Sequence, residues 1–185
     1  ERNARIVQWA SYYSGKGFPT LVVATRTLHI YILETLLKEA VQPELVRILF
    51  GWATPNERDE AFDWFRTTPG SILITPLVKD GVSINEIRAG VIADCVGDSE
   101  TANQIIGRFL RKKPDEGENF AEITWFRDSQ HPTLRRSSNH VLTAFAGYGH
   151  NVYDGPSAPD IDRLLKGVQS PASGAKAKPK RRRRA

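Results

Sequence analysis

The strongest constraint on the fold is an alternation of short apolar runs with longer amphipathic segments. The apolar runs predict strands at 20–25, 45–50, 71–75, 90–93 and 120–126. The amphipathic segments predict helices at 2–14, 27–40, 56–67, 99–113 and 133–146. Strands that alternate with helices indicate an α/β fold: a three-layer sandwich with a mainly parallel sheet and helices on both faces.

Local patterns support two of these helices. Apolar residues in helical register are Leu28, Ile32, Leu36 and Leu37 in the segment 27–40, and Ala61, Phe62 and Phe65 in the segment 56–67. Thr54 or Asn56 can cap the segment 56–67, and Pro55 fits its first turn.

Composition excludes several classes of protein. No apolar run approaches the ~18 residues of a membrane span, and no secretory signal opens the chain. A single cysteine, Cys95, excludes an internal disulfide and fits a reducing compartment. We therefore expect an intracellular, cytoplasmic protein, or a nuclear one if the source is eukaryotic. One Cys and four scattered His give no metal-ligand spacing, so no metal site is expected and the histidines are expected at surface or capping positions.

Positive charge is concentrated at the C-terminal end. Residues 171–185 hold seven of the 26 cations and no acid, so the other 170 residues carry 19 cations against 21 acids. We expect a folded domain at 1–155 and a flexible tail at 156–185, with a short helix near 161–165 and a basic C-terminus. The basic run serves solubility, localisation or salt-dependent nucleic-acid binding. Any nucleic-acid contact on the domain itself must be local.

The beginning of the chain carries a further expectation. The sequence starts at Glu1 and contains no Met. Since a primary translation product starts with Met, we expect a trimmed or processed fragment.

The segment 99–113 has the most distinctive helical pattern. At about 100° per residue, Gln104, Gly107, Arg108 and Arg111 form one polar stripe. The opposite side carries Ala102, Ile105, Ile106, Phe109 and Leu110. Paired arginine forks suit phosphate oxygens, and the glycine between Gln104 and Arg108 lets a ligand approach the backbone. The alternative is a solvated helix face whose arginines pair with Asp80 or Asp94.

The chemistry-bearing residues converge on one edge of the predicted sheet. Ligands of parallel α/β sheets bind at the carboxyl ends of the strands. The segments at that edge are 25–26, 51, 75–83 and 94–99, together with the polar stripe of the helix that follows.

The order of these features resembles the second, C-terminal RecA-like domain of superfamily 2 DEAD/DEAH-type helicases. The stretch Gln104-Ile105-Ile106-Gly107-Arg108-Phe109-Leu110-Arg111 fits motif VI of that family, Q-x-x-G-R-x-x-R. Residues 74–84 are similar to motif V, 21–37 to motif IV and its helix, and 51–65 to the intervening G-x₆-R-x₆-F loop and helix. The continuation at 110–114 looks most like XPB-type and phage UvsW-type helicases. The resemblance covers roughly residues 5–150.

The resemblance implies a role for each matching residue. Arg108 and Arg111 would be arginine fingers that reach the γ-phosphate of ATP, and Gln104 would order the catalytic site. The implied nucleotide-binding residues are Gly81, Ser83 and Gly107. Ser83 stands where the family often has an Asp that binds the ribose, and Asn85 stands where Pro is usual.

Nucleic-acid contacts are implied for three further residues at the same edge, Thr25, Arg26 and Thr75. Thr75 would face the nucleic-acid backbone, and Thr25 and Arg26 would contact a phosphate. The alternative for Arg26 is a pairing with a carboxylate.

The motifs that are absent matter equally. These 185 residues contain neither a Walker A loop nor a D-E-x-D/H box. The resemblance therefore implies that ATP and Mg²⁺ are held by a first RecA-like domain, in the same parent chain or another chain. The expected function is half of an ATP-dependent helicase or translocase acting on DNA, with RNA as the other candidate, and with no activity in this chain alone.

Two other functions are consistent with parts of the sequence. A helicase-derived module without catalysis would bind nucleic acid or protein, or act as a scaffold. The intact Gln104, Arg108 and Arg111 set argues against it, since a scaffold has no need of paired fingers. A dinucleotide-binding enzyme is remote, because no G-x-G-x-x-G follows a strand.

Overall fold

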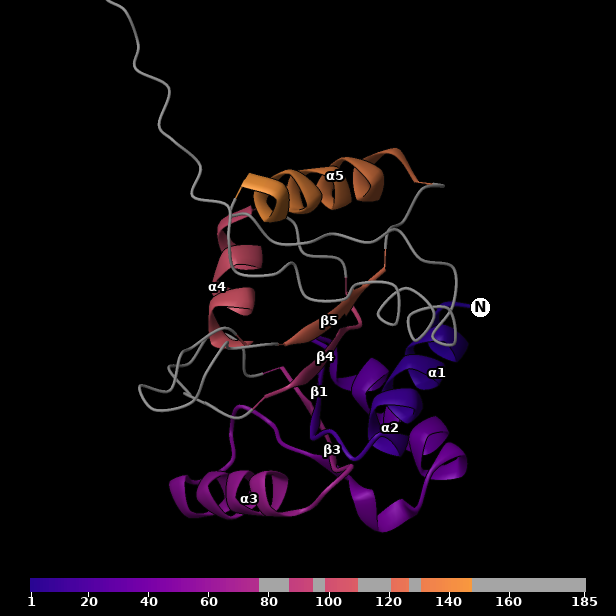
Figure 1. Ribbon diagram of the computed structural model, residues 1–185, viewed down its shortest axis with the longest axis vertical. Helices are drawn as coiled ribbons and strands as arrows, with labels where there is room; N and C mark the ends of the chain where they lie inside the picture. Colours follow the sequence, from indigo (N-terminus) through magenta and orange to yellow (C-terminus); the bar gives the residue numbers. More distant parts are fainter. Residues whose placement is uncertain (77–86, 95–98, 110–120, 127–130, 148–185) are drawn as a thin grey trace, which may run out of the picture. The chain divides into compact units, whose positions relative to one another are not determined.

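Helices and strands alternate along the chain as the sequence predicts (Figure 1). The computed structural model describes residues 1–76, 87–94, 99–109, 121–126 and 131–147. The chain divides into two units, Glu1–Tyr153 and Asp154–Ala185, and every described residue belongs to the first. The predicted tail helix and basic C-terminus therefore lie outside the described residues. Within the described part, no helix is long and apolar enough to cross a membrane.

The described elements have these bounds: α1 Arg2–Gly15, β1 Thr20–Val23, α2 Thr27–Ala40, η1 Pro43–Leu45, β2 Val46–Ile48, α3 Pro55–Thr67, β3 Ile72–Thr75, β4 Ala89–Ile92, α4 Ser99–Phe109, β5 Glu122–Trp125 and α5 Pro132–Gly147. Only the short 3₁₀ helix η1 has no counterpart among the predicted elements.

The five strands form one sheet in the order β2-β3-β1-β4-β5, and all neighbouring pairs are parallel. Strands β1, β3 and β4 are buried along their whole length. A strand that is covered on both faces needs apolar side chains at every position, which explains the continuous runs in the sequence.

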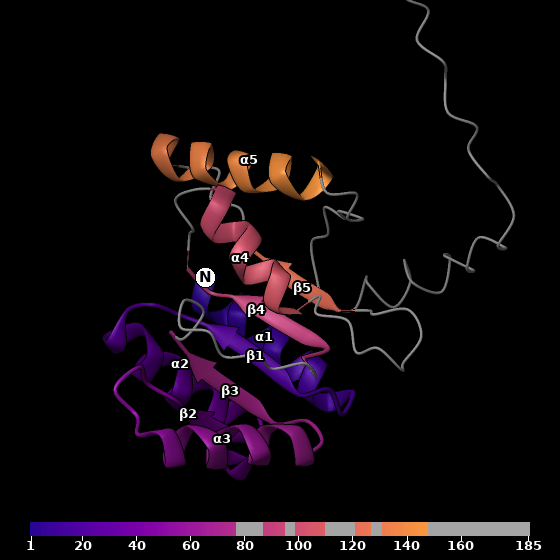
Figure 2. The same cartoon turned by 90° about the vertical axis from the view of Figure 1, so that its left-hand side faces the viewer.

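Helices cover both faces of the sheet (Figures 1 and 2). Helices α1 and α2 lie on one face, and α3 and α4 lie on the other. On the α3 and α4 side, a buried cluster joins strand residues such as Leu21 and Leu73 to Phe65 of α3 and Ile105 of α4. Helix α5 packs on α4 through a second cluster that includes Val141. The α/β sandwich expected from the sequence is confirmed.

Helix α3 starts at a capping box. The Glu57 amide donates to the Thr54 hydroxyl at 3.3 Å, and the Glu57 carboxylate accepts from the Thr54 amide at 2.7 Å. These bonds satisfy two donors at the helix start, and Pro55 occupies the first turn. Of the two predicted caps, Thr54 is therefore the one used.

The buried face of α2 differs from the register seen in the sequence. Ile30, Leu33 and Leu37 are fully buried, whereas Leu28 and Ile32 are 73% and 41% exposed. Helix α2 carries two apolar stripes, and only one of them can face the sheet and α1. The other remains at the surface.

Candidate functional site

The carboxyl ends of β1, β3 and β4 form one rim, as the sequence predicts. Val23 is paired with both Thr75 and Ile92 in the parallel ladders. Beyond the ladders, the Ala24 amide donates to the Thr75 carbonyl at 3.2 Å, and the Ala93 amide donates to the Val23 carbonyl at 2.9 Å. The rim is therefore rigid up to the residues that carry polar side chains.

Helix α4 exposes two members of its predicted polar stripe. Gln104 and Gly107 are exposed. The opposite face is buried, through Ala102, Ile105, Ile106 and Phe109. Among the predicted members of this site, Arg111 lies outside the described residues, and Arg108 is described only as part of the α4 backbone.

One close contact between α4 and the sheet contributes to the rotation of the helix. A Cβ added at Gly90 of β4 would lie 2.3 Å from a ring carbon of Phe109. Phe109 is 3% exposed and belongs to the buried cluster that includes Leu21 and Ile105. Because the ring packs directly on the glycine backbone, Gln104 and Gly107 are held on the outward side of the helix.

Gly107 itself is not required by the packing of this chain. A Cβ placed there would meet no atom within 4 Å. A helix-interior glycine is less stable than alanine by roughly 0.5–1 kcal/mol. The described part of the fold therefore gives no reason for glycine at this position, which leaves room for a ligand-related reason.

The carboxylate of Asp94 organises the rim after β4. The backbone amide of Thr25 donates to Asp94 Oδ2, and the Thr25 hydroxyl donates to the same oxygen at 2.6 Å. His29 Nδ1 lies 3.1 Å from Asp94 Oδ1, and His29 Nε2 lies 3.0 Å from Asn3 Oδ1. The network joins α1, the β1–α2 connection and the end of β4.

The electrostatics of Asp94 are decided by these bonds. Burial acts to raise the pKa of its carboxyl group, but the hydrogen bonds from Thr25 and His29 outweigh it and hold the pKa below its ordinary value. Asp94 is therefore a carboxylate at neutral pH. Among the described residues, no cluster of three His, Cys, Asp or Glu side chains could hold a metal ion.

The network changes the interpretation of Thr25. A hydroxyl has one hydrogen, and that of Thr25 is already donated to Asp94. Thr25 can therefore donate to a phosphate only if this bond breaks. Arg26 is different: it is exposed, begins α2 as its N-cap residue, and pairs with none of the described carboxylates. Of the two alternatives for Arg26, the pairing with a carboxylate is absent from the described part.

The other predicted contacts are less accessible or lie elsewhere. Thr75 ends β3 and is only 2% exposed. Gly81 and Ser83 lie outside the described residues.

Sequence reasoning missed the role of His29. It was expected at the surface or as a cap, but its ring is 19% exposed and lies between Asn3 and Asp94. Its partners are 26 residues before it and 65 residues after it, so no local pattern marks it. The only available signal was the position of Asp94 at the end of a predicted strand.

Several solved structures share this fold. T4 UvsW matches with 17% identity over 79% of this chain and a TM-score of 0.60, and this chain spans 32% of the length of that one. The C-terminal domain of the DEAD-box protein Dbp5 matches with 19% identity over 89% of this chain and 92% of that chain, at a TM-score of 0.61. The DUF1998 helicase MrfA matches with 19% identity over 89% of this chain and 23% of that one, at a TM-score of 0.58.

The sequence itself identifies the family. No protein with a curated description matches it. The model of the helicase conserved C-terminal domain matches residues 4–113, which is more than half of the chain and includes α1 through α4 with its polar face. The chain therefore belongs to the helicase conserved C-terminal domain family.

Proposed function

We propose that this chain is the second motor domain of an ATP-dependent superfamily 2 helicase or translocase that acts on DNA. The observation that carries the proposal is the outward face of α4, where Gln104 and Gly107 are exposed. On the same helix, Arg108 and Arg111 complete motif VI. ATP and Mg²⁺ are held by a first RecA-like domain that these 185 residues do not contain.

The chemistry assigned to this face is charge stabilisation. The transferring γ-phosphoryl group spreads negative charge over its oxygens, and a planar guanidinium can donate two hydrogen bonds to them. The open space around Gly107 fits a polyphosphate that approaches the helix closely. The contact between Gly90 and Phe109 keeps this face turned outward before the two domains close.

The nucleic-acid part of the proposal is assigned first to Arg26. Its exposed guanidinium has no described carboxylate partner, whereas Thr25 is bonded to Asp94 and Thr75 is buried. Among the structures of similar fold, MrfA is bound to DNA and AMPPNP, and S. cerevisiae Dbp5 is bound to RNA and ADP BeF3. The choice of DNA rests on the resemblance to UvsW-type helicases.

The test is a set of arginine variants in the two-domain assembly. Arg108→Ala and Arg111→Ala are each expected to lower the kcat of DNA-stimulated ATP hydrolysis by about 10³-fold or more, with a smaller effect on KM. Arg108→Lys keeps the charge but loses the fork, so it should recover only part of the rate.

Arg5→Ala is the matched control. Arg5 is 56% exposed on α1, which lies on the opposite face of the sheet from α4. Its removal should leave kcat unchanged. If Arg108→Ala and Arg5→Ala have equal effects in folded assemblies, the chain is not a finger-supplying motor domain, and the non-catalytic module becomes the better account.

A further inference from the structure

An apolar surface remains uncovered where β2 meets the first half of α2. Trp52 is 70% exposed, Leu28 73%, Tyr31 48% and Ile32 41%. Leu28, Tyr31 and Ile32 lie at i, i+3 and i+4 of α2, and Trp52 lies in the loop between β2 and α3. Large apolar side chains gathered at one place on a surface indicate a binding site.

Three rings in this surface form a connected platform, which we call the aromatic platform: Tyr31, Phe50 and Trp52. The rings of Phe50 and Trp52 are stacked, with centroids 4.2 Å apart and an interplanar angle of 10°. The rings of Tyr31 and Phe50 are tilted, with centroids 5.5 Å apart. Since Trp52 is stacked on one ring and still 70% exposed, most of its indole is open to a second planar partner.

The loop that carries Trp52 is held in place on both sides. The guanidinium of Arg58 donates to the Gly51 carbonyl, and the Ala53 amide donates to the Phe50 carbonyl at 3.2 Å. The capping box of Thr54 and Glu57 then fixes the start of α3. A platform that is ordered before binding loses little entropy when a partner stacks on it.

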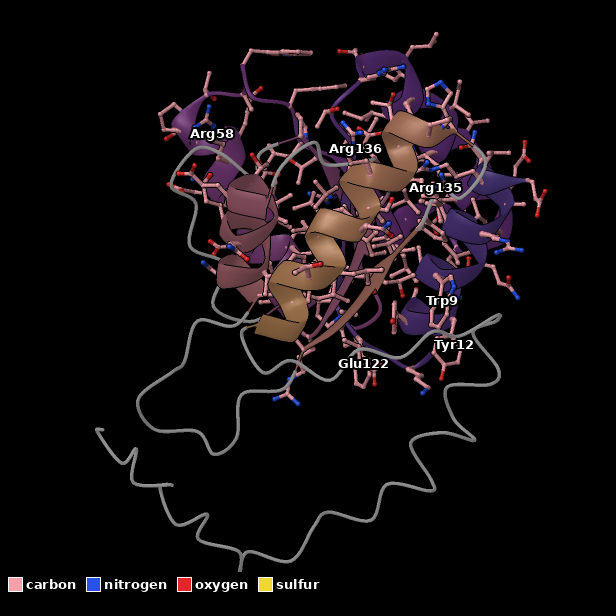
Figure 3. All side chains as sticks on the ribbon, turned by 90° about the horizontal axis from the view of Figure 1, so that it is seen from above. Trp9, Tyr12, Arg58, Glu122, Arg135 and Arg136 are labelled. Atoms are coloured by element: carbon pink, nitrogen blue, oxygen red, sulfur yellow. The ribbon has the colours of Figure 1, made fainter. Side chains whose placement is uncertain are left out.

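Position and charge indicate what that partner is. The platform lies at the carboxyl ends of β1 and β2, on the rim that also carries Arg26. Figure 3 shows Arg58, Arg135 and Arg136 toward one end of the sheet and Tyr12 and Glu122 toward the other. Arg135 and Arg136 are exposed in the first turns of α5. Because α5 packs on α4 at the β5 side of the sheet, these two arginines lie away from the platform, and Arg26 at the start of α2 is the exposed arginine on the same side as its rings.

Carboxylates also lie on the elements that carry the platform. Glu34 is paired with Lys38 at 2.7 Å, whereas Glu57 keeps its negative charge and accepts from the amide and hydroxyl of Thr54 at the start of α3. A partner with flat apolar faces and a negative backbone fits this surface best. Unpaired nucleotides have both properties.

We propose that the aromatic platform stacks unpaired bases of a single-stranded nucleic acid whose phosphates pass Arg26. This inference rests on the proposed function and deepens it, because it assigns single-stranded nucleic acid to the β2 end of the rim. Stacking makes the contact tolerant of base sequence, since every base has an aromatic face. Arg26 supplies the phosphate contact, which is salt-dependent.

The test measures binding by the full chain in the absence of ATP and of any other domain. The probes are a fluorescent oligothymidylate of about 12 nucleotides and an abasic strand with the same number of phosphates. Trp52→Ala should weaken oligothymidylate binding by roughly 5- to 150-fold, the effect of one lost base stack. Trp52→Phe should restore most of the affinity. Neither change should alter binding of the abasic strand or the slope of affinity against salt.

Tyr12→Ala is the matched control. Tyr12 is an aromatic residue of α1 near the opposite end of the sheet, so its loss should leave oligothymidylate affinity unchanged (Figure 3). The basic tail contributes equally in every variant and cancels from the comparison.

Three results would overturn the inference. One is unchanged binding by Trp52→Ala, which would leave the platform to a protein partner. Another is an equal loss for both probes. The third is a wild-type dimer in sedimentation velocity that Trp52→Ala converts to a monomer, because a second copy would then cover the platform. The binding assay contains no ATP, so a negative result in it does not contradict the proposed role in ATP hydrolysis. Conversely, a negative ATPase result does not contradict base stacking that the binding assay has measured.

Discussion

Two donors from Thr25 and one ring nitrogen from His29 meet the carboxylate of Asp94. Through these bonds, one carboxylate holds Thr25 and His29 to the end of β4. The Asp94 side chain is 18% exposed. A charged acceptor in a partly buried site contributes more to stability than a neutral one, and its loss leaves unsatisfied donors behind.

Asp94→Asn should lower the free energy of unfolding at pH 7 by about 1 to 3 kcal/mol, because an amide oxygen replaces a charged acceptor. The folded-state pKa of Asp94 lies below its unfolded value of about 3.9. Its charge therefore stabilises the fold fully above that unfolded pKa, and the contribution disappears as pH falls through the folded pKa. The difference between wild type and Asp94→Asn should shrink below about pH 4 in urea titrations.

Asp63→Asn is the control for this effect. Asp63 is 73% exposed and pairs with Arg66 one helical turn away. An exposed pair contributes about 0 to 1 kcal/mol, so this variant should stay close to wild type at both pH values. A constant Asp94→Asn difference from pH 7 to pH 3 would show that the carboxylate charge is not what stabilises the rim.

At the scale of elements, helix α4 is positioned by packing rather than by its polar residues. Phe109 sits against the backbone of Gly90, Ile105 is buried in the same cluster, and Ile106 is buried against α5. The polar face of α4 points outward because the apolar face of the helix packs against the sheet. Activity and stability should therefore respond differently to changes on the two sides of this helix.

Two glycine substitutions separate these sides. Gly90→Ala should destabilise the fold by about 1 to 3 kcal/mol, since the methyl group overlaps the Phe109 ring, and Phe109→Leu in the same chain should recover part of the loss.

Gly107→Ala should stabilise the fold by about 0.5 to 1 kcal/mol and still reduce ATP turnover in the two-domain assembly. Urea unfolding and steady-state kinetics measure both. A destabilised Gly107→Ala, or one with full turnover, would contradict a ligand-related role for this glycine.

The same scale shows what the sequence can predict. The apolar runs located every strand of the sheet, because a strand covered on both faces leaves an unbroken pattern. The buried face of α2 was not predictable, since Leu28 and Ile32 are as apolar as Ile30 and Leu33. The exposure of Gln104 and Gly107 on α4 was predictable from their spacing. The His29 network was not, because its partners come from distant parts of the chain.

At the scale of the whole molecule, the proposed function makes this chain one side of an ATP site whose other side is a first RecA-like domain. The family match over residues 4–113 includes α4. The sequence holds no Walker A loop with which to bind ATP on its own. The proposed arginine fingers are thus without a phosphate to stabilise until a first domain brings ATP to them.

The most direct test of this shared ATP site is a comparison of three samples. ATP hydrolysis is measured for the purified chain alone, for a first RecA-like domain alone, and for the two mixed with DNA. We predict no turnover by this chain, little by the first domain, and DNA-stimulated turnover in the mixture that Arg108→Ala abolishes. Turnover by this chain alone that disappears in Arg108→Ala would contradict the proposal, and so would a mixture in which the arginine makes no difference.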